Sequence, residues 1–328
     1  MADRHTPLGL PADVLADLRA RLGRPVRAVR ALPGGDICRA YAVDLDVPVP
    51  EPVAEPVDEP VPEPVAEPMA GGPVVGPAPR PATRPVFVKH LAAAPEGFFA
   101  AEARGLAWLA EAEAVLVPRV LAVGAAYLAL SWVAPGRPTV AAAEELGRGL
   151  ARLHRAGAPA YAVPEPSFIG PLPLRPGPAG TWAELCGERL LRPMARAAVD
   201  SGGLPAAGLA VIDRLVERLG ELVPAEPPAR LHGDLWSGNV LWSADGLPRL
   251  VDPSAYAGHR ETDLAMLALF NAPQLDRVLA AYHEAYPLAA GWRERVGLHQ
   301  VWPLLVHARL FGPGYGLAAL EAAGRYVG

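Results

Sequence analysis

The segment RLHGDLWSGNVLWSADGLPRLVD, residues 230–252, constrains the fold more than any other part of the chain. Two short apolar runs in it, VLW and LV, flank the pair Asp245-Gly246, and Asp-Gly between strands is a strong signal for a two-residue β-hairpin turn. Counting outward from such a turn places Asn239 opposite Asp252 at the open end of the hairpin. Because opposed residues have Cβ atoms about 4.5–5.5 Å apart, we expect an amide oxygen and a carboxylate side by side.

Three polar side chains at linked spacings give this hairpin a chemical interpretation. Mg²⁺ prefers oxygen ligands, so Asn239 and Asp252 are the predicted metal ligands. Asp234 lies five residues before Asn239, where its carboxylate can reach a hydroxyl group held near metal-bound phosphates. Asp-x₄-Asn followed by a second Asp is the order of base and metal ligands in protein kinases. The alternative, a purely structural His-Gly-Asp turn, is less favoured because all three positions fit one arrangement.

Residues upstream supply the remaining parts of a nucleotide site. Lys89 lies near the end of the expected strand 86–90, where a phosphate-contacting lysine belongs, and Glu102 follows thirteen residues later on a helix from which it can pair with Lys89. Taken alone, both residues could instead face solvent. Gly34 and Gly35 follow an expected strand and allow a backbone turn over phosphates, although Pro-Gly-Gly is also an ordinary turn. Three backbone positions between the expected lobes are predicted to bind adenine: Ser131, Trp132 and Val133.

The apolar periodicity divides the chain into a strand-rich part and a mainly helical part. We therefore predict an α+β, two-lobed fold with a small β-rich nucleotide-binding lobe at 1–134 and a larger helical catalytic and substrate lobe at 135–328. Thr139 is the predicted N-cap of the first helix in the second lobe. The elements expected before Pro135 are helices at 11–22 and 96–113 and strands at 26–32, 39–45, 86–90, 119–123 and 126–132. Those expected after it include loops at 158–180 and helices at 181–200 and 205–222.

A tract rich in Pro and Glu, residues 46–85, interrupts the hairpin expected from strands 39–45 and 86–90. Proline recurs every second to fourth residue and the unit EPVxEP repeats, a composition that favours an extended, polyproline-like chain. The flanking strands can still pair because a long flexible loop costs little extra closure entropy. The tract is either a docking ligand for a proline-binding module or a tolerated spacer, and we interpret it as a spacer.

Composition excludes several other classes of protein. The chain has 328 residues with 30 Lys and Arg against 35 Asp and Glu, a net charge of −5. Nucleic-acid binding needs a basic surplus, so no nucleic-acid partner is expected. Two cysteines do not make a disulfide framework, the N-terminus lacks the apolar core of a signal peptide, and the longest apolar stretch is too short to span a membrane. We therefore expect a cytoplasmic protein without a membrane partner.

Several motifs resemble those of the fructosamine kinase family, within the wider group of aminoglycoside- and choline-kinase-like phosphotransferases. HGDLWSGN at 232–239 is similar to the family's first signature, and DPSAYAGHRETDLAML at 252–267 resembles its second. Further similar stretches are GGDICRAY, FVK, FFAAEARGLAWLA, ELGRGLARLHR, ERLLRP and the C-terminal run 282–315. The resemblance covers nearly the whole chain except the proline-rich tract, and it implies a protein-kinase-like fold.

The resemblance implies an enzyme that uses ATP and Mg²⁺ to phosphorylate the sugar O3 of ketoamines such as fructosamines or ribulosamines. The phosphorylated product would be unstable and would shed its sugar, so the biological outcome would be deglycation. Asp234 carries over as the base, Asn239 and Asp252 as metal ligands, and Lys89 with Glu102 as the nucleotide pair.

Five further residues of the two signatures take supporting or substrate roles under this resemblance. Trp236 is either a platform for the sugar or its amine substituent, or a buried aromatic residue. Arg260 and Glu261 either contact substrate or support the site. His232 and Asp263 are predicted to support the catalytic loop.

Two departures from the family pattern leave alternatives open. Cys38 stands where the family usually has Asn in the phosphate loop, either as a redox-sensitive thiol or, as we favour, as a small packed side chain. The region after Ile169-Gly170 lacks the family's usual Gln and Asn, which leaves the acceptor open. The alternatives are a kinase for an aminoglycoside, amino sugar or choline-like alcohol, and a catalytically silent ATP-binding scaffold.

Overall fold

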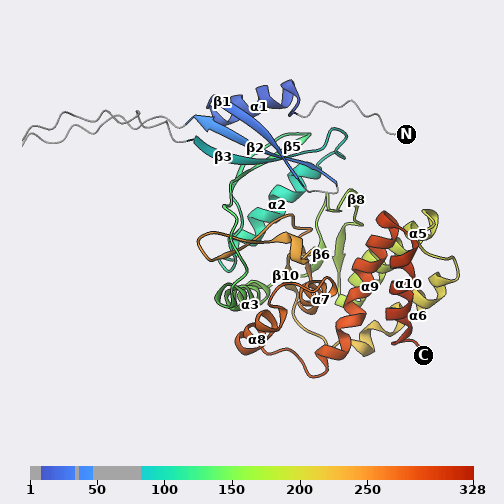
Figure 1. Cartoon of the computed structure of the whole chain (residues 1–328). Helices are drawn as coiled ribbons and strands as arrows, with labels where there is room; N and C mark the ends of the chain where they lie inside the picture. Colours follow the sequence, from blue (N-terminus) through green and yellow to red (C-terminus); the bar gives the residue numbers. More distant parts are fainter. Residues whose placement is uncertain (1–8, 34–36, 47–82) are drawn as a thin grey trace, which may run out of the picture.

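The computed structural model describes residues 9–33, 37–46 and 83–328, and it has the predicted two-lobed arrangement (Figure 1). The smaller lobe contains a five-stranded sheet in the order β1-β2-β3-β5-β4. Across the described ranges, every helix is too short or too polar to span a lipid bilayer. The elements of this lobe are α1 (Ala12–Leu22), β1 (Val26–Leu32), β2 (Arg39–Asp46), β3 (Thr83–His90), α2 (Phe98–Glu111), β4 (Val120–Val123) and β5 (Tyr127–Ser131).

Strands β2 and β3, which flank the proline-rich tract, pair without interruption from Arg39 opposite His90 to Asp46 opposite Thr83. The pairing predicted from the sequence is therefore confirmed, while the interpretation of the tract itself falls on residues 47–82, outside the described residues. Strand β3 also pairs with β5 on its other side. Lys89 consequently lies on the central strand of the sheet.

The larger lobe is mainly helical, as predicted, and α9 runs through it in contact with α7 and α10 (Figure 1). Thr139 caps α3, since its hydroxyl oxygen accepts a hydrogen bond from the amide of Ala142 at 3.1 Å. The residues predicted as a helix at 181–200 form α4 and α5 with a π-helical stretch, Leu185–Leu191, between them. The helices are α3 (Val140–Ala156), α4 (Trp182–Glu184), α5 (Arg192–Asp200), α6 (Gly208–Leu222), α7 (Glu261–Leu269), α8 (Leu275–Ala285), α9 (Trp292–Phe311) and α10 (Pro313–Gly324).

The prediction of loops throughout residues 158–180 is wrong. This region contains β6 (Tyr161–Val163), β7 (Phe168–Ile169), β8 (Leu172–Pro173) and β9 (Gly177–Ala179). Strands β6 and β9 join β10 (Ala229–Leu231) and β13 (Tyr256–Gly258) in a sheet of order β10-β13-β6-β9. Strand β9 contains Pro178, which has no N–H to donate, and it lies at the edge of the sheet, where a proline is tolerated.

The hairpin at the site has a register one residue away from the prediction. Strands β11 (Val240–Trp242) and β12 (Pro248–Leu250) place Val240 opposite Leu250. The loop is one residue longer than a two-residue turn, and Gly246 supplies the positive φ of 80° that such a three-residue loop needs. Asn239 therefore lies opposite Val251, whose amide donates to the Asn239 carbonyl at 3.0 Å. The expected direct opposition of Asn239 and Asp252 is wrong.

Backbone hydrogen bonds fix the hairpin to the segment that connects the lobes. The amide of Gly136 donates to the carbonyl of Trp242 at 2.6 Å, and the amide of Ala244 donates to the carbonyl of Ala134 at 2.9 Å. On the other strand, the amide of Leu250 donates to the carbonyl of Leu116 at 2.9 Å. The hairpin is thus held against both lobes.

Candidate active site

A cavity of about 1670 Å³ lies between the lobes, and most of the residues expected to bind nucleotide and metal line it. Lys89 lies on β3, Asp234 and Asn239 lie between β10 and β11, and Asp252 follows the hairpin. These residues are distant in sequence, yet they face one space. Because pockets for a single small ligand usually measure about 300–1,000 Å³, this cavity has room for a nucleotide and a second substrate.

Lys89 joins two carboxylates at the inner wall of this cavity. Its Nζ lies 2.8 and 3.0 Å from the carboxylate oxygens of Glu102, and 3.0 Å from Oδ1 of Asp252. Burial would lower the pKa of Lys89, but the two carboxylates outweigh it and hold the pKa above its ordinary value. The ammonium is therefore charged, and α2 is fixed to β3 through the ion pair that the sequence predicted.

Asn239 brings Asp234 and Asp252 together despite the shifted register. Its Nδ2 donates to the carbonyl and Oδ2 of Asp234, at 2.8 and 3.2 Å, and approaches the carbonyl of Asp252 at 3.5 Å. Since the nitrogen of the amide is engaged in these contacts, its oxygen is the atom left to act as a ligand. Asp252 has a positive φ of 56°, a rare conformation for a residue other than glycine.

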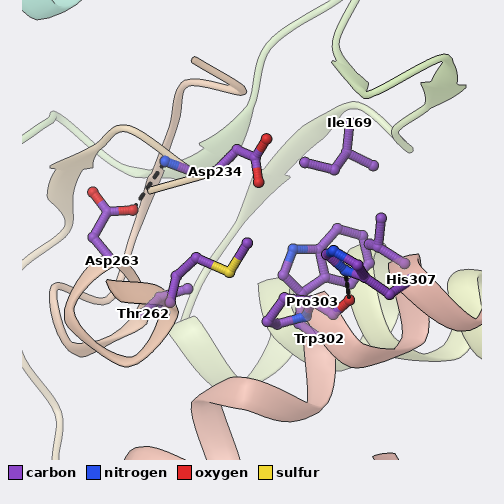
Figure 2. A pocket seen from close by; sticks show the side chains of 10 residues that line it. Ile169, Asp234, Thr262, Asp263, Trp302, Pro303 and His307 are labelled. Atoms are coloured by element: carbon purple, nitrogen blue, oxygen red, sulfur yellow. Dashed lines mark hydrogen bonds between the residues drawn. The ribbon is translucent and has the colours of Figure 1, made fainter. Parts of the chain in front are cut away.

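Asp263 anchors the loop that carries Asp234. Its carboxylate accepts hydrogen bonds from the amides of His232 and Gly233, at 2.7 and 2.9 Å, and lies 3.3 Å from Nε2 of His154. Figure 2 shows Asp263 beside Asp234. Burial raises the pKa of Asp234 to about 7, and the neighbouring carboxylate of Asp252 adds to this rise. A carboxylate held on a fixed loop in a dry setting is suited to accept a proton from a bound hydroxyl.

A small recess beside Asp234 opens toward α9 (Figure 2). His307 lines it, and the Nδ1 of this residue lies 2.7 Å from the carbonyl of Pro303. A carbonyl can only accept, so Nδ1 carries the proton, and burial lowers the pKa of His307 below its ordinary value. The neutral ring therefore keeps Nε2 as a hydrogen-bond acceptor. His307 was missed from the sequence, because its place depends on how α9 packs beside the catalytic loop.

Comparison with known proteins shows a family relationship. A family model described as fructosamine kinase matches residues 65–327, more than half of the chain. The chain belongs to the fructosamine kinase family. It is 42% identical over 237 residues to a probable ketoamine kinase of Thermus thermophilus, a match that covers 72% of this chain and 85% of that protein.

The fold of this fructosamine kinase family member is similar to that of several solved structures. A candidate fructosamine-3-kinase from Thermobifida fusca superimposes with a TM-score of 0.78 at 39% identity, covering 95% of this chain and 98% of the other. A choline kinase from Streptococcus pneumoniae has a TM-score of 0.56 at 13% identity, covering 95% and 96%. The second likeness concerns the fold alone, and it confirms the predicted two-lobed, kinase-like architecture.

Trp236 of this family member lines the cavity with 38% of its surface exposed, so the alternative of a buried aromatic residue is wrong. Ser131, Trp132 and Val133 also line the cavity. The amide of Ser131 already donates to the carbonyl of Arg119 at 2.8 Å, so the amides of Trp132 and Val133 are the remaining donors of this segment for adenine.

Arg260 and Glu261 do not belong to the described lining of the cavity, which corrects the expectation that they contact substrate. Both are buried in ion pairs at the start of α7. The guanidinium of Arg260 donates to both carboxylate oxygens of Glu226, at 2.6 and 2.7 Å, and Arg295 binds Glu261 in the same way, at 2.6 and 2.9 Å. These pairs hold α7, and with it the loop anchor Asp263, in place.

The phosphate loop is described only in part. Gly34 and Gly35 lie outside the described residues. Cys38 is buried among apolar side chains that include Phe98 and Leu128, as the packed alternative predicted. Burial raises the pKa of the Cys38 thiol to about 11, although nearby Lys89 opposes this shift. The thiol is therefore protonated and weakly nucleophilic at neutral pH.

Proposed function

We propose that this protein transfers the γ-phosphoryl group of ATP to the sugar O3 hydroxyl of a ketoamine, with Asp234 as the catalytic base. The observation that carries the proposal is the position of Asp234. Asp234 lines both the large cavity, together with Lys89, Asn239 and Asp252, and the small recess that His307 lines. A base at this junction can face a phosphate group on one side and an acceptor hydroxyl on the other.

The nucleotide half of the site lies in the smaller lobe, which we take as residues 1–134. Lys89, held by Glu102, binds the phosphates, and backbone groups of Trp132 and Val133 bind adenine. Gly34 and Gly35 complete the phosphate loop in this proposal.

Asn239 and Asp252 suit a hard divalent cation. The amide oxygen of Asn239 and the carboxylate of Asp252 are the kind of oxygen ligand that Mg²⁺ binds while it keeps several of its waters. When bound, the ion neutralises charge on the β- and γ-phosphates. Lys89 contributes a fixed positive charge beside the same phosphates, because its own charge is set by two carboxylates.

The transfer step forms one bond and breaks one. The O3 oxygen of the sugar attacks the γ-phosphorus, the bond from that phosphorus to the β–γ bridging oxygen breaks, and ADP leaves. The O3 proton passes to Asp234, late in the step because the transition state is loose. The phosphorylated ketoamine then sheds its sugar, which amounts to deglycation.

The larger lobe, residues 135–328, holds the acceptor in this proposal. Trp236 provides a platform for the sugar, and Nε2 of His307 accepts a hydrogen bond from one of its hydroxyl groups. His232 and Asp263 keep the catalytic loop in position.

Two competing functions fit the described residues less well. An aminoglycoside carries several ammonium groups and favours an acidic lining, whereas aromatic rings gather beside Asp234. A silent scaffold would have no need for a complete set of Lys89, Asn239, Asp234 and Asp252 around one cavity.

An acceptor screen tests the proposal. Purified protein is incubated with ATP, Mg²⁺ and fructose or ribulose adducts of lysine, with kanamycin, choline and free fructose as competing classes, and ADP release is measured. We expect turnover with the ketoamines and a product phosphorylated at O3 by ³¹P NMR. Turnover with kanamycin or choline alone would refute the proposal.

A further inference from the structure

Five aromatic side chains form a continuous group along one side of the cavity, beginning next to Asp234. Neighbouring ring centroids lie 5.0–6.3 Å apart, within the range of direct aromatic contact. We call this group the aromatic wall, and every member lines the cavity. The members are Trp236, Phe270, His307, Phe311 and Tyr315.

The outer part of the aromatic wall is open to solvent. Phe311, the last residue of α9, has 53% of its surface exposed, and even Trp236, at the inner end of the wall, has 38%. An exposed apolar surface that continues directly from a reaction site is typical of a ligand-binding groove. In the proposed function the sugar lies against Trp236 and His307. The aromatic wall continues beyond them to Phe311 and Tyr315, which can contact the part of the acceptor that is attached to the sugar.

The five side chains of the aromatic wall include neither a carboxylate nor a cationic group, so the wall offers no charged partner to a carboxylate of the acceptor. The cations in the described lining lie elsewhere: Lys89 is held by its two carboxylates, and Arg104 on α2 donates to the carbonyl of Pro166 at 2.8 Å. Among the described residues that line the cavity, the acids are Glu102, Glu111, Asp234 and Asp252. Glu102 is paired with Lys89, and Glu111 lies on α2, 3.5 Å from Arg230. Asp234 and Asp252 belong to the reaction centre. A group on the wall is thus recognised by aromatic faces, which attract apolar chains and a single ammonium group.

In a ketoamine the nitrogen is bonded to C1, two carbons from C3. When O3 lies at Asp234, the ammonium group lies close by and its substituent extends away from the sugar. We infer that the aromatic wall binds this substituent, and that it selects ketoamines of amines with an uncharged aliphatic or aromatic chain over those with a carboxylate next to the nitrogen. This inference rests on the proposed function and names the residues that read the amine.

Two probes test the inference with the full-length protein, ATP and Mg²⁺. One is the fructose adduct of hexylamine, which has an uncharged chain, and the other is the fructose adduct of glycine, whose carboxylate follows the nitrogen directly. The variants are Phe311→Ala and Tyr315→Ala. The matched control is Leu317→Ala, because Leu317 is 62% exposed on α10 but lies outside the described lining of the cavity.

The wild-type protein is expected to have the lower KM for the hexylamine adduct. Phe311→Ala should raise that KM roughly tenfold, the size of one aromatic contact, with kcat unchanged and the glycine adduct unaffected. Leu317→Ala should change neither KM. Equal effects of Phe311→Ala on both adducts, or no effect of either wall variant, would overturn the inference while leaving the proposed function intact. Turnover of a fructose–lysine adduct but of neither probe would overturn the inference alone, whereas failure to phosphorylate any ketoamine would overturn both.

Discussion

Replacing Glu102 with Gln removes one of the two charges that hold Lys89. The substitution keeps the volume of the side chain, so the packing of α2 against the sheet is preserved. The carboxylate of Asp252, 3.0 Å from Nζ of Lys89 in the wild type, is then the one charged partner that remains from this pair of acids, and the ammonium group is expected to shift toward it. We expect two consequences, a loss of stability and a weaker interaction with ATP.

The size of both effects follows from the geometry. Breaking a fully buried ion pair costs about 3–5 kcal/mol when the remaining charge has no partner. Asp252 still neutralises Lys89 in this variant, so we expect the free energy of unfolding to fall by only about 1–3 kcal/mol. Removing one preorganised donor from a site where transition-state charge develops typically costs about 10²–10³-fold in rate. Because Lys89 is displaced in this variant but still present, we expect kcat/KM for ATP to fall by about a hundredfold, the lower end of that range.

Urea unfolding followed by tryptophan fluorescence measures the first effect, and steady-state kinetics with varied ATP measures the second. Glu111→Gln is the matched control, since Glu111 lies on the same helix but its side chain is 67% exposed. The control should leave both quantities within error. An unchanged kcat/KM for ATP in Glu102→Gln would refute the role assigned to this pair.

Two further predictions follow from the same loop and its support. Gly233→Ala should abolish activity and lower stability by more than about 2 kcal/mol, because its Cβ would lie 2.0 Å from the carbonyl oxygen of Ser254 at a φ of 81°; Gly246→Ala, with φ 80° and open space, should cost only the strain of about 1–2 kcal/mol. Burial, with His299 close by, lowers the pKa of His259 to about 3, so the unfolded chain binds an extra proton below pH 6.5. The free energy of unfolding should therefore decrease as the pH is lowered below 6.5, by about 2 kcal/mol at pH 5. Urea unfolding of His259→Gln over the same pH range should show a smaller decrease than the wild type.

Local sequence patterns were sufficient for much of this fold and for naming most of the candidate residues that the structure brings together at one cavity. Periodicity located β1 and α1 to within a residue, and a threonine before an apolar-periodic run correctly marked the cap of α3. Lys89 and Glu102 could be paired because Glu102 follows thirteen residues later, on the helix after the strand that carries Lys89. These features depend on residues close in sequence.

Features that depend on tertiary packing could not be predicted in the same way. The Asp245-Gly246 pair favours a two-residue turn, yet the hairpin has a loop one residue longer, and the amide of Ala244 in that loop donates to the carbonyl of Ala134, more than 100 residues earlier in the chain. The sequence left open whether Arg260 contacts substrate or supports the site, because its partner, Glu226, lies 34 residues away. His307 reaches the site only through the packing of α9.

The most direct test of the account is Asp234→Asn, which removes the proposed base but keeps its shape. Calorimetric titration should give an ATP affinity within about threefold of the wild type, a change of less than about 0.7 kcal/mol. Turnover of a fructose–lysine adduct should fall by about 10²–10⁴-fold, the usual contribution of a positioned base. Turnover within a few-fold of the wild type would contradict the assignment of Asp234 and the phosphoryl-transfer mechanism built on it.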